Sequence, residues 1–200
     1  MKSIIAIVLA YLFGSIPWAL VVGKVFYHTD IRTQGSGNLG GTNAGRVLGK
    51  KAGVSVTILD GLKAFFVVVF CHYLAPEATI IAGLACCVGH CFPIFANFKG
   101  GKAVATTMGY FLGISLFVTH HVFWQFFFIV ICFFVILYLT KMVSFSSISA
   151  ILIAVIVSFV LRNGLDISVS ILILFVFVTY RHKDNIKRII NHEEKKITWM

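Results

Sequence analysis

The sequence predicts an all-α integral membrane protein with seven transmembrane helices. Hydrophobic residues make up 59% of the 200 residues, which leaves too few polar side chains to cover a water-soluble globule of this size. A helix needs about 20 apolar residues to cross a bilayer, and several such runs are separated by short charged or glycine-rich breaks. The basic residues gather on alternate connections, which is typical of a multi-pass membrane protein.

Seven apolar runs are the expected spans. In chain order they are Ser3–Gly23, Ala52–Ala75, Ala78–Phe98, Ala103–Thr119, Val122–Thr140, Met142–Leu161 and Leu165–Tyr180. The first could be mistaken for a secretory signal, but Pro17 and Trp18 lie near its end and no small-x-small cleavage site follows. We therefore expect a retained helix. No internal repeat is apparent, so residues 1–200 are expected to form a single polytopic membrane domain.

The formal net charge of +10 would indicate nucleic-acid binding in a soluble protein, so the positions of the basic residues decide its meaning. With seven spans, one side of the membrane receives residues 24–51, 99–102 and 141 and the tail from residue 181. These segments hold fourteen Lys or Arg, whereas the other side holds Lys2 and Arg162. The positive-inside rule places the N-terminus outside and the C-terminus in the cytoplasm. Nucleic acid is not an expected partner.

Three polar segments on the expected cytoplasmic side contain the candidate functional residues. Residues 24–51 are rich in glycine, and a long loop of this kind beside a membrane is usually functional. Residues 90–106 contain Lys99–Lys102, two cations around two glycines, which is typical of an anion-binding loop. The tail from Arg181 has isoleucines at helical spacing, which predicts a C-terminal interfacial helix.

Glycine-rich turns with nearby Arg or Lys bind phosphate, because the glycines allow close approach and the cations donate charge-assisted hydrogen bonds. The segment Gly35–Gly40 matches G-x-G-x-x-G, but a βαβ unit does not fit between membrane helices, and no Walker motif occurs. Dinucleotide binding and nucleotide hydrolysis are therefore not supported. On the tail helix, His182, Asn185 and Glu193 share the apolar stripe and are expected to face protein.

No cofactor or metal is expected. Cys87, His90 and Cys91 share one helix face, so a zinc site stays open as a weaker alternative. Asp60 and Lys63 lie at i and i+3 inside the second expected span, and a structural ion pair is favoured over a role in the site.

Four segments stand out in chain order: GSIP from Gly14, DIRTQGSGNLGGTNAGRVLGKKAG from Asp30, GHCFPIFANFKGGKAVAT from Gly89 and RHKDNIKRI from Arg181. Together they resemble the bacterial acyl-phosphate-dependent glycerol-3-phosphate acyltransferase family over the whole chain. The resemblance implies transfer of a fatty acyl group from acyl phosphate to the sn-1 hydroxyl of glycerol 3-phosphate. The products would be lysophosphatidic acid and phosphate, in the first acylation step of phospholipid synthesis at the cytoplasmic face of the bacterial inner membrane.

The resemblance also implies roles for the residues at matching positions of this chain. The residue patterns add further candidate site residues. The expected catalytic residues are Ser36, Arg46, His182 and Asn185. The expected substrate-binding residues are Thr42, Asn43, His90, Lys99, Gly100, Gly101, Lys102 and Ser144. Glu193 falls on a glutamate that supports the structure of the family's third motif. The expected partners are the two small-molecule substrates, membrane lipid and other phospholipid-synthesis enzymes.

The chain departs from the commoner family pattern at Gly41, usually alanine, and at Ala64 and Ala103, usually glycine. If position 103 requires a positive φ, an alanine there would strain the loop by roughly 1 kcal/mol. The expected mechanism is direct attack of the glycerol hydroxyl, with acyl transfer through Ser36 as the competing route. A transporter of a phosphorylated or organic anion and a membrane scaffold are the rival functions. A transporter fits less well, because its ligand groups should lie near the middle of the membrane, whereas the polar candidates gather at one surface. A scaffold fits less well, because it would not need two phosphate-binding loops.

Overall fold

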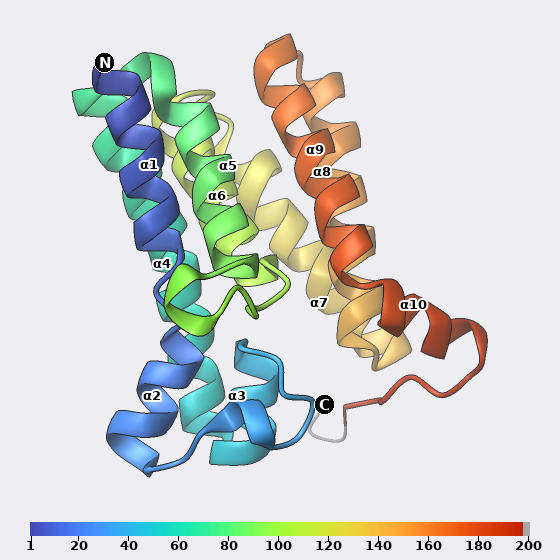
Figure 1. Ribbon diagram of the computed structural model, residues 1–200. Coiled ribbons are helices and arrows are strands. Elements are labelled where there is room, and N and C mark those ends of the chain that lie inside the picture. Colours follow the sequence, from blue (N-terminus) through green and yellow to red (C-terminus); the bar gives the residue numbers. More distant parts are fainter. Residues whose placement is uncertain (198–200) are drawn as a thin grey trace. The chain divides into compact units, whose positions relative to one another are not determined.

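The computed structural model describes residues 1–197, and within them the chain forms helices and no strand, as the sequence predicts. The helices are α1 (Lys2–Gly14), α2 (Trp18–Tyr27), α3 (Gly41–Leu48), α4 (Lys50–Leu74), α5 (Thr79–Cys91), α6 (Val104–Phe117), α7 (Phe128–Thr140), α8 (Val143–Val160), α9 (Leu165–Arg181) and α10 (Lys183–Ile190) (Figure 1). Short 3-10 turns lie at Ile31–Thr33, Pro76–Ala78 and Ile94–Ala96, and a π-helical turn lies at Phe123–Phe127.

The contacts divide the chain into two compact units, Met1–Phe117 and the part from Val118 onward, and each is described by itself. The expected single membrane domain stays a prediction. In the first unit, α4 packs against α3, α5 and α6, and α1 packs against α5. In the second unit, α8 packs between α7 and α9.

The helices support a multi-pass membrane protein. Among the described residues, four helical segments are long and apolar enough to cross a bilayer: Lys50–Leu74, Pro76–Ala96, Phe123–Thr140 and Val143–Val160. The count rises to six if each of two bent pairs, α1 with α2 and α9 with α10, is one span. The helix α6 has 14 residues, about 21 Å at 1.5 Å per residue, which is shorter than a bilayer core of about 30 Å. The number of seven spans and the topology stay predictions.

The first expected span, Ser3–Gly23, is not one straight helix. Helix α1 ends at Gly14, α2 begins at Trp18, and the two are bent by 41° at the break. Pro17 causes the break, because it lacks an N–H group and disfavours helical backbone at the preceding residue. The segment 24–51 also differs from expectation, since the end of α2 and all of α3 lie within it.

Glycines let the helices of the first unit approach closely. A Cβ added to Gly14 of α1 would collide with the backbone of α5, and one added to Gly109 of α6 would collide with the carbonyl of Gly61 in α4. The hydroxyl of Tyr11 also donates to the carbonyl oxygen of Phe92 at 2.8 Å. Small residues at helix crossings are typical of membrane proteins. The contacts of Gly14 and Tyr11 hold α5 and the residue after it, and the amides of Gly100 and Gly101 are bonded to the end of this helix.

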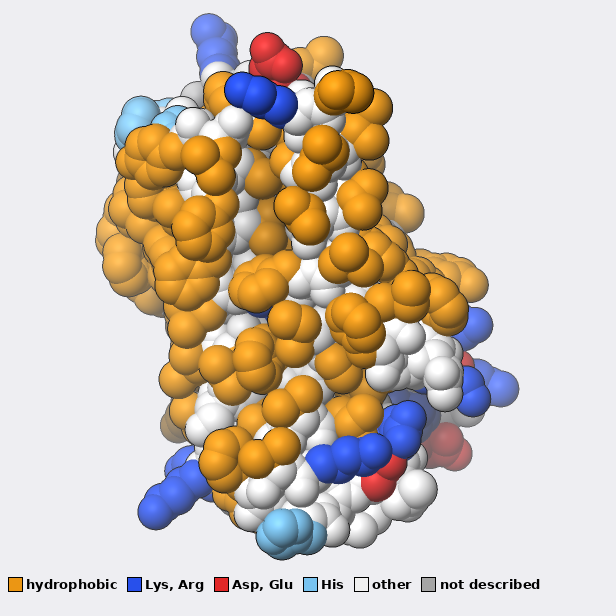
Figure 2. All heavy atoms as spheres, turned by 60° about the vertical axis from the view of Figure 1, so that its left-hand side comes forward, with side chains coloured by type: hydrophobic (Ala, Val, Ile, Leu, Met, Phe, Trp, Pro, Cys, Tyr) orange, Lys and Arg blue, Asp and Glu red, His pale blue; other side chains and the backbone are white. Residues whose placement is uncertain are grey.

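Large apolar side chains remain exposed along the helices, which suits contact with lipid. Examples are Ile4 at 68%, Phe70 at 59% and Val160 at 73% exposed. On the face shown in Figure 2, hydrophobic side chains predominate over its middle part, and Lys and Arg side chains lie toward its upper and lower ends. An apolar exterior of this extent would be unfavourable in water.

Candidate phosphate-binding site

Helix α3 carries Thr42 and Arg46 and lies against α4 at closely spaced glycines. A Cβ added to Gly53 of α4 would lie 2.6 Å from the Cα of Gly45. A Cβ at Gly41 would collide with the side chain of Thr57, so the threonine fills the space that an alanine methyl would need. The packing fixes α3 on α4 and leaves Thr42 and Arg46 exposed.

Asn43 shapes the glycine-rich segment that precedes α3. Its side chain is 2% exposed, and its Oδ1 accepts a hydrogen bond from the backbone N–H of Ser36 at 2.8 Å. Its Nδ2 donates to the carbonyl oxygens of Ile31 and Gln34, both at 3.2 Å. Asn43 therefore positions Ser36, which is itself exposed. A direct contact between Asn43 and substrate stays a prediction.

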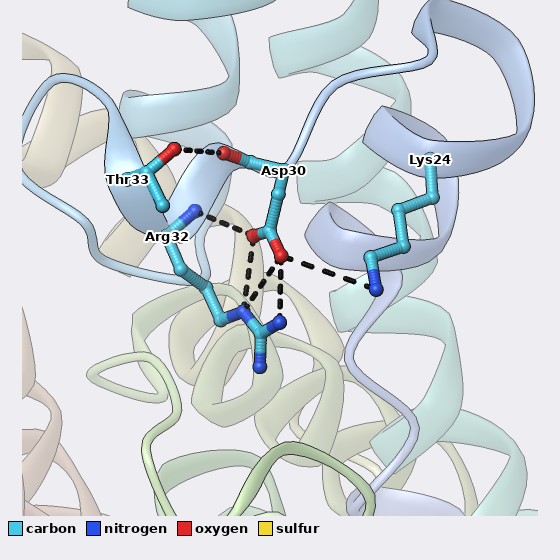
Figure 3. A network of polar contacts seen from close by, with 4 residues as sticks. All are labelled: Lys24, Asp30, Arg32 and Thr33. Atoms are coloured by element: carbon cyan, nitrogen blue, oxygen red, sulfur yellow. Dashed lines mark hydrogen bonds and ion pairs between the residues drawn. The ribbon is translucent and has the colours of Figure 1, made fainter.

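The start of this segment is held by Asp30 (Figure 3). Its carboxylate accepts hydrogen bonds from the Arg32 side chain, the shortest from a terminal guanidinium nitrogen at 2.6 Å, and Lys24 lies 3.9 Å away. The hydroxyl of Thr33 donates to the Asp30 carbonyl oxygen at 2.9 Å. The hydrogen bond from Arg32 lowers the pKa of Asp30 to about 2. Asp30 is therefore ionised at neutral pH and keeps Arg32 in place.

A pocket of about 310 Å³ lies where the two glycine-rich segments meet in the first unit. Its lining residues are Arg32, Gly37, Ala96, Asn97 and Lys99. Two cationic side chains thus border one hollow, although the Asp30 carboxylate already offsets the charge of Arg32. Lys99 was an expected site residue, whereas Ser36, Arg46 and Lys102 are not among the residues that line this pocket.

The backbone amides of the Lys99–Lys102 segment are not arranged as expected for an anion-binding loop. The N–H of Gly100 donates to the carbonyl of Cys91 at 3.2 Å, and the N–H of Gly101 donates to the carbonyl of His90 at 3.1 Å. A Cβ at Gly101 would collide with the His90 ring. The glycines therefore allow close contact with the end of α5, and these two amides are already bonded to α5. An anion bound at this segment would therefore meet the lysine side chains and not these two amides.

Three residues that flank Lys99–Lys102 lie in the left-handed region of backbone conformation. Asn97 has φ 54°, Phe98 has φ 58° and Ala103 has φ 58°. Asparagine tolerates this region, but an alanine Cβ crowds the following carbonyl oxygen. The condition for strain at position 103 is therefore met.

We expect Ala103→Gly to stabilise the protein by about 0.5–1 kcal/mol. The glycine removes the cost of a left-handed alanine, and this gain outweighs the larger freedom of glycine in the unfolded chain. The matched control is Ala105→Gly, a helical position in α6, which should be destabilising by a similar amount. Thermal unfolding in detergent measures both variants, and a lower melting temperature for Ala103→Gly would contradict the strain.

The third expected segment lies in the second unit at the junction of α9 and α10, which are bent by 63°. His182 and Asn185 are 3% and 8% exposed, so both face protein as predicted. The Nδ1 of His182 lies 2.8 Å from the carbonyl oxygen of Val178. A carbonyl oxygen only accepts, so Nδ1 carries the hydrogen.

The prediction that Glu193 shares the stripe is wrong. Helix α10 ends at Ile190, so helical spacing does not continue to Glu193, which is exposed. The neighbouring Glu194 turns inward instead. Its Oε1 accepts hydrogen bonds from Ser144 Oγ at 2.7 Å and Asn185 Nδ2 at 2.6 Å, and its Oε2 accepts from Arg188 Nε at 2.8 Å.

Known proteins resemble the chain over nearly its whole length. Residues 4–192 match the family described as Glycerol-3-phosphate acyltransferase. The chain belongs to the glycerol-3-phosphate acyltransferase family. Among the relatives of that name, the protein of Geobacillus kaustophilus is 44% identical over 96% of this chain and 95% of its own. That of Bacillus subtilis is 46% identical over 97% of both chains.

Two crystal structures of a glycerol-3-phosphate acyltransferase also match. Both are of PlsY (YgiH), described as an integral membrane glycerol 3-phosphate acyltransferase. The glycerol 3-phosphate form has a TM-score of 0.90 and 32% identity, and the lysophosphatidic acid form has 0.88 and 31%. Each covers 99% of this chain and 96% of the crystal structure's chain. This likeness supports a multi-pass membrane acyltransferase.

Two residues of this acyltransferase-family chain were missed by the sequence analysis. Arg32 was not among the expected site residues, although it is a cation within the first glycine-rich segment. Glu194 was missed because a helical spacing was continued beyond the end of α10. Among the described residues, no group of three His, Cys, Asp or Glu side chains has a spacing that suits a metal ion.

Proposed function

We propose that the chain transfers a fatty acyl group from acyl phosphate to the sn-1 hydroxyl of glycerol 3-phosphate, giving lysophosphatidic acid and inorganic phosphate. The observation that carries the proposal is the convergence of Arg32 and Lys99 on one polar pocket, in a chain of this family. Arg46 adds to it, because within residues 1–197 its guanidinium has no hydrogen-bond or ion-pair partner. Arginine suits phosphate because its planar fork binds two oxygens at once.

In the proposed reaction, the C1 hydroxyl oxygen of glycerol 3-phosphate attacks the carbonyl carbon of the acyl phosphate. A carbon–oxygen ester bond forms, the carbon–oxygen bond to the phosphate group breaks, and the hydroxyl proton leaves on the phosphate. The cationic side chains hold the phosphates and offset the negative charge that grows on the carbonyl oxygen. Acyl phosphate is already activated, so direct attack is favoured over an acyl-enzyme on Ser36.

His182 is the histidine whose tautomer suits proton acceptance. With hydrogen on Nδ1 toward Val178, the lone pair of the neutral ring lies on Nε2. A protein base is less necessary here than in ester hydrolysis, because the substrate phosphate can take the proton. A catalytic role for His182, and for Asn185 on α10, is part of the proposal on the ground of the family resemblance alone.

The location is part of the same proposal. The bias of Lys and Arg toward residues 24–51, 99–102 and the C-terminal tail favours a site on the cytoplasmic face of the bacterial inner membrane. Other phospholipid-synthesis enzymes are proposed partners, because they would consume lysophosphatidic acid. No cofactor takes part in the proposed reaction.

The test is phosphate release from palmitoyl phosphate by purified protein, with and without glycerol 3-phosphate. We expect release that requires glycerol 3-phosphate and yields lysophosphatidic acid, and we expect it to fall strongly in Lys102→Ala. Lys51→Ala is the matched control, since Lys51 is an exposed lysine outside the site and should retain activity. No release by folded protein would overturn the proposal and favour anion transport.

A further inference from the structure

An apolar groove of about 530 Å³ runs along α9 in the second unit. Its lining residues are Leu172, Ile173, Val176, Phe177 and Tyr180, all on this helix. Their spacing of one and three positions places them on one face, which covers about 12 Å at 1.5 Å per residue. Val176 and Tyr180 are 60% and 61% exposed. The groove is therefore an open surface of large apolar side chains.

The other side of α9 is already packed against protein. Ile171, Leu174 and Val178 are at most 2% exposed, and α8 lies against this helix. The small residues Ser168 and Ser170 are also buried, at 2% exposed each. Helices that associate in a membrane approach each other at small residues, and the lining of the groove contains none. The groove therefore suits a flexible chain better than a further helix.

A cation lies at one end of the groove. Helix α9 leads into α10 (Figure 1), and the Nζ of Lys183 lies 5.4 Å from the centroid of the Tyr180 ring. An ammonium group at this distance from an aromatic face makes a cation–π contact, which limits where Lys183 points. Lys183 is exposed, and α10 carries three basic residues against one acidic residue, Asp184. The apolar surface thus ends at positive charge.

An amphiphile with an apolar chain and an anionic headgroup matches both features of this surface. Anionic phospholipids are such amphiphiles, and a lysine at the membrane surface attracts them. Acyl phosphate and lysophosphatidic acid have the same chemistry, but the lining contains none of the residues assigned to the proposed reaction. A lipid of the surrounding bilayer is therefore the favoured occupant.

We propose that the α9 groove binds a bilayer phospholipid with an anionic headgroup. One acyl chain lies along the groove, and the phosphate accepts a hydrogen bond from the Lys183 ammonium beside Tyr180. The lipid is bound and not consumed. The proposal therefore does not rest on the proposed acyl transfer.

Helix α7 offers a matched comparison within the same unit. The Nζ of Lys141 lies 4.2 Å from the centroid of the Tyr138 ring, so a lysine and a tyrosine three positions apart also meet where α7 ends. The residues that line the groove all belong to α9. Comparison of the two lysines therefore separates a lipid site from general attraction of anionic lipid to basic residues.

The first test measures headgroup preference by native mass spectrometry of the purified protein. Phosphatidylglycerol and phosphatidylcholine with identical acyl chains are titrated separately. We expect phosphatidylglycerol to bind more tightly, and Lys183→Gln to weaken its binding about fivefold without a change for phosphatidylcholine. Lys141→Gln should change neither affinity by more than about twofold. Equal losses in the two variants would show general attraction of charge and overturn the site.

The second test fills the groove. Val176→Trp places a large ring among the lining side chains and should weaken binding of both lipids at least about threefold, because the acyl chain loses its apolar contacts. Val135→Trp is the matched control, since Val135 of α7 is 51% exposed and does not line the groove. Unchanged binding of phosphatidylglycerol in Val176→Trp would overturn the proposal. Val176 and Lys183 are exposed, so these variants should keep their melting temperatures within about 2 °C.

Competition with palmitoyl phosphate distinguishes the bilayer lipid from the acyl donor. We expect it to displace phosphatidylglycerol only at concentrations above those at which phosphatidylglycerol itself binds. Displacement at lower concentrations, lost in Val176→Trp, would assign the groove to the acyl donor and overturn the assignment to a phospholipid.

Discussion

Glu194→Ala is expected to destabilise the protein by about 2–3 kcal/mol, which lowers the melting temperature by roughly 5–10 °C. The carboxylate accepts hydrogen bonds from Ser144, Asn185 and Arg188, and its removal leaves donors without their partner in a partly buried place. The loss is smaller than for a fully buried ion pair, because the Arg188 side chain is 40% exposed. Thermal unfolding in detergent measures the effect.

Glu193→Ala is the matched control, because it removes the same chemical group one residue earlier. Glu193 is exposed and its carboxylate lies beyond α10, so its loss should change the melting temperature by no more than about 2 °C. Equal destabilisation by both variants would contradict the assignment of the supporting role to Glu194.

Glu194 should also make stability depend on pH. Burial alone would raise the pKa of Glu194, but the hydrogen bonds from Ser144, Asn185 and Arg188 outweigh it and lower the pKa below the usual value of a glutamate side chain. A lowered pKa in the folded state means that this stabilisation is complete above the unfolded value and is lost as pH falls through the folded value. Glu194→Gln should therefore show a flatter loss of stability below about pH 4.5 than the unaltered protein.

Arg46→Ala is expected to reduce kcat/KM about a hundredfold, equivalent to roughly 3 kcal/mol, with the melting temperature unchanged. Arg46 is exposed on α3, and the part of the chain that the structure describes contains no hydrogen-bond or ion-pair partner for it. Its removal therefore costs no internal contact. The proposed loss is of a charge-assisted hydrogen bond to substrate phosphate.

Arg46→Lys tests the geometry of that contact. Lysine keeps the charge but not the planar fork, so it should recover only part of the lost activity. Steady-state kinetics with glycerol 3-phosphate as the varied substrate gives the comparison. Full activity in Arg46→Ala would remove this residue from the proposed site, and a large fall in melting temperature would show that its role is structural.

Hydrophobic patterning predicted where the helices lie, but not how each begins and ends. Pro17 lies inside an otherwise continuous apolar run, and the run alone does not show that α1 ends before it. Helix α3 was not predicted because glycine is a poor helix former, yet Gly41 and Gly45 are the residues that allow α3 to pack on α4. Tertiary packing overrides local propensity there.

The sequence predicted the segments of the candidate site but not the contacts between them. Composition located the two glycine-rich segments, and the structure brings them together at the pocket that Lys99 lines. Sequence spacing does not reveal contacts between distant residues, so the hydrogen bond between Lys63 and His90, 27 positions apart, could not be predicted. The same holds for the way Asn43 bonds to residues seven to twelve positions earlier.

The backbone amides of Gly100 and Gly101 are already hydrogen-bonded, which limits how selectively the proposed phosphate loop, Lys99–Lys102, can recognise an anion. Backbone N–H groups that converge on an anion measure its shape, whereas lysine ammonium groups attract charge from many directions. With both amides donating to the end of α5, we expect the proposed phosphate loop to distinguish charged from uncharged ligands better than it distinguishes one tetrahedral oxyanion from another. Affinity should then weaken as salt screens the lysines, and inorganic phosphate, the product, should compete with the substrates.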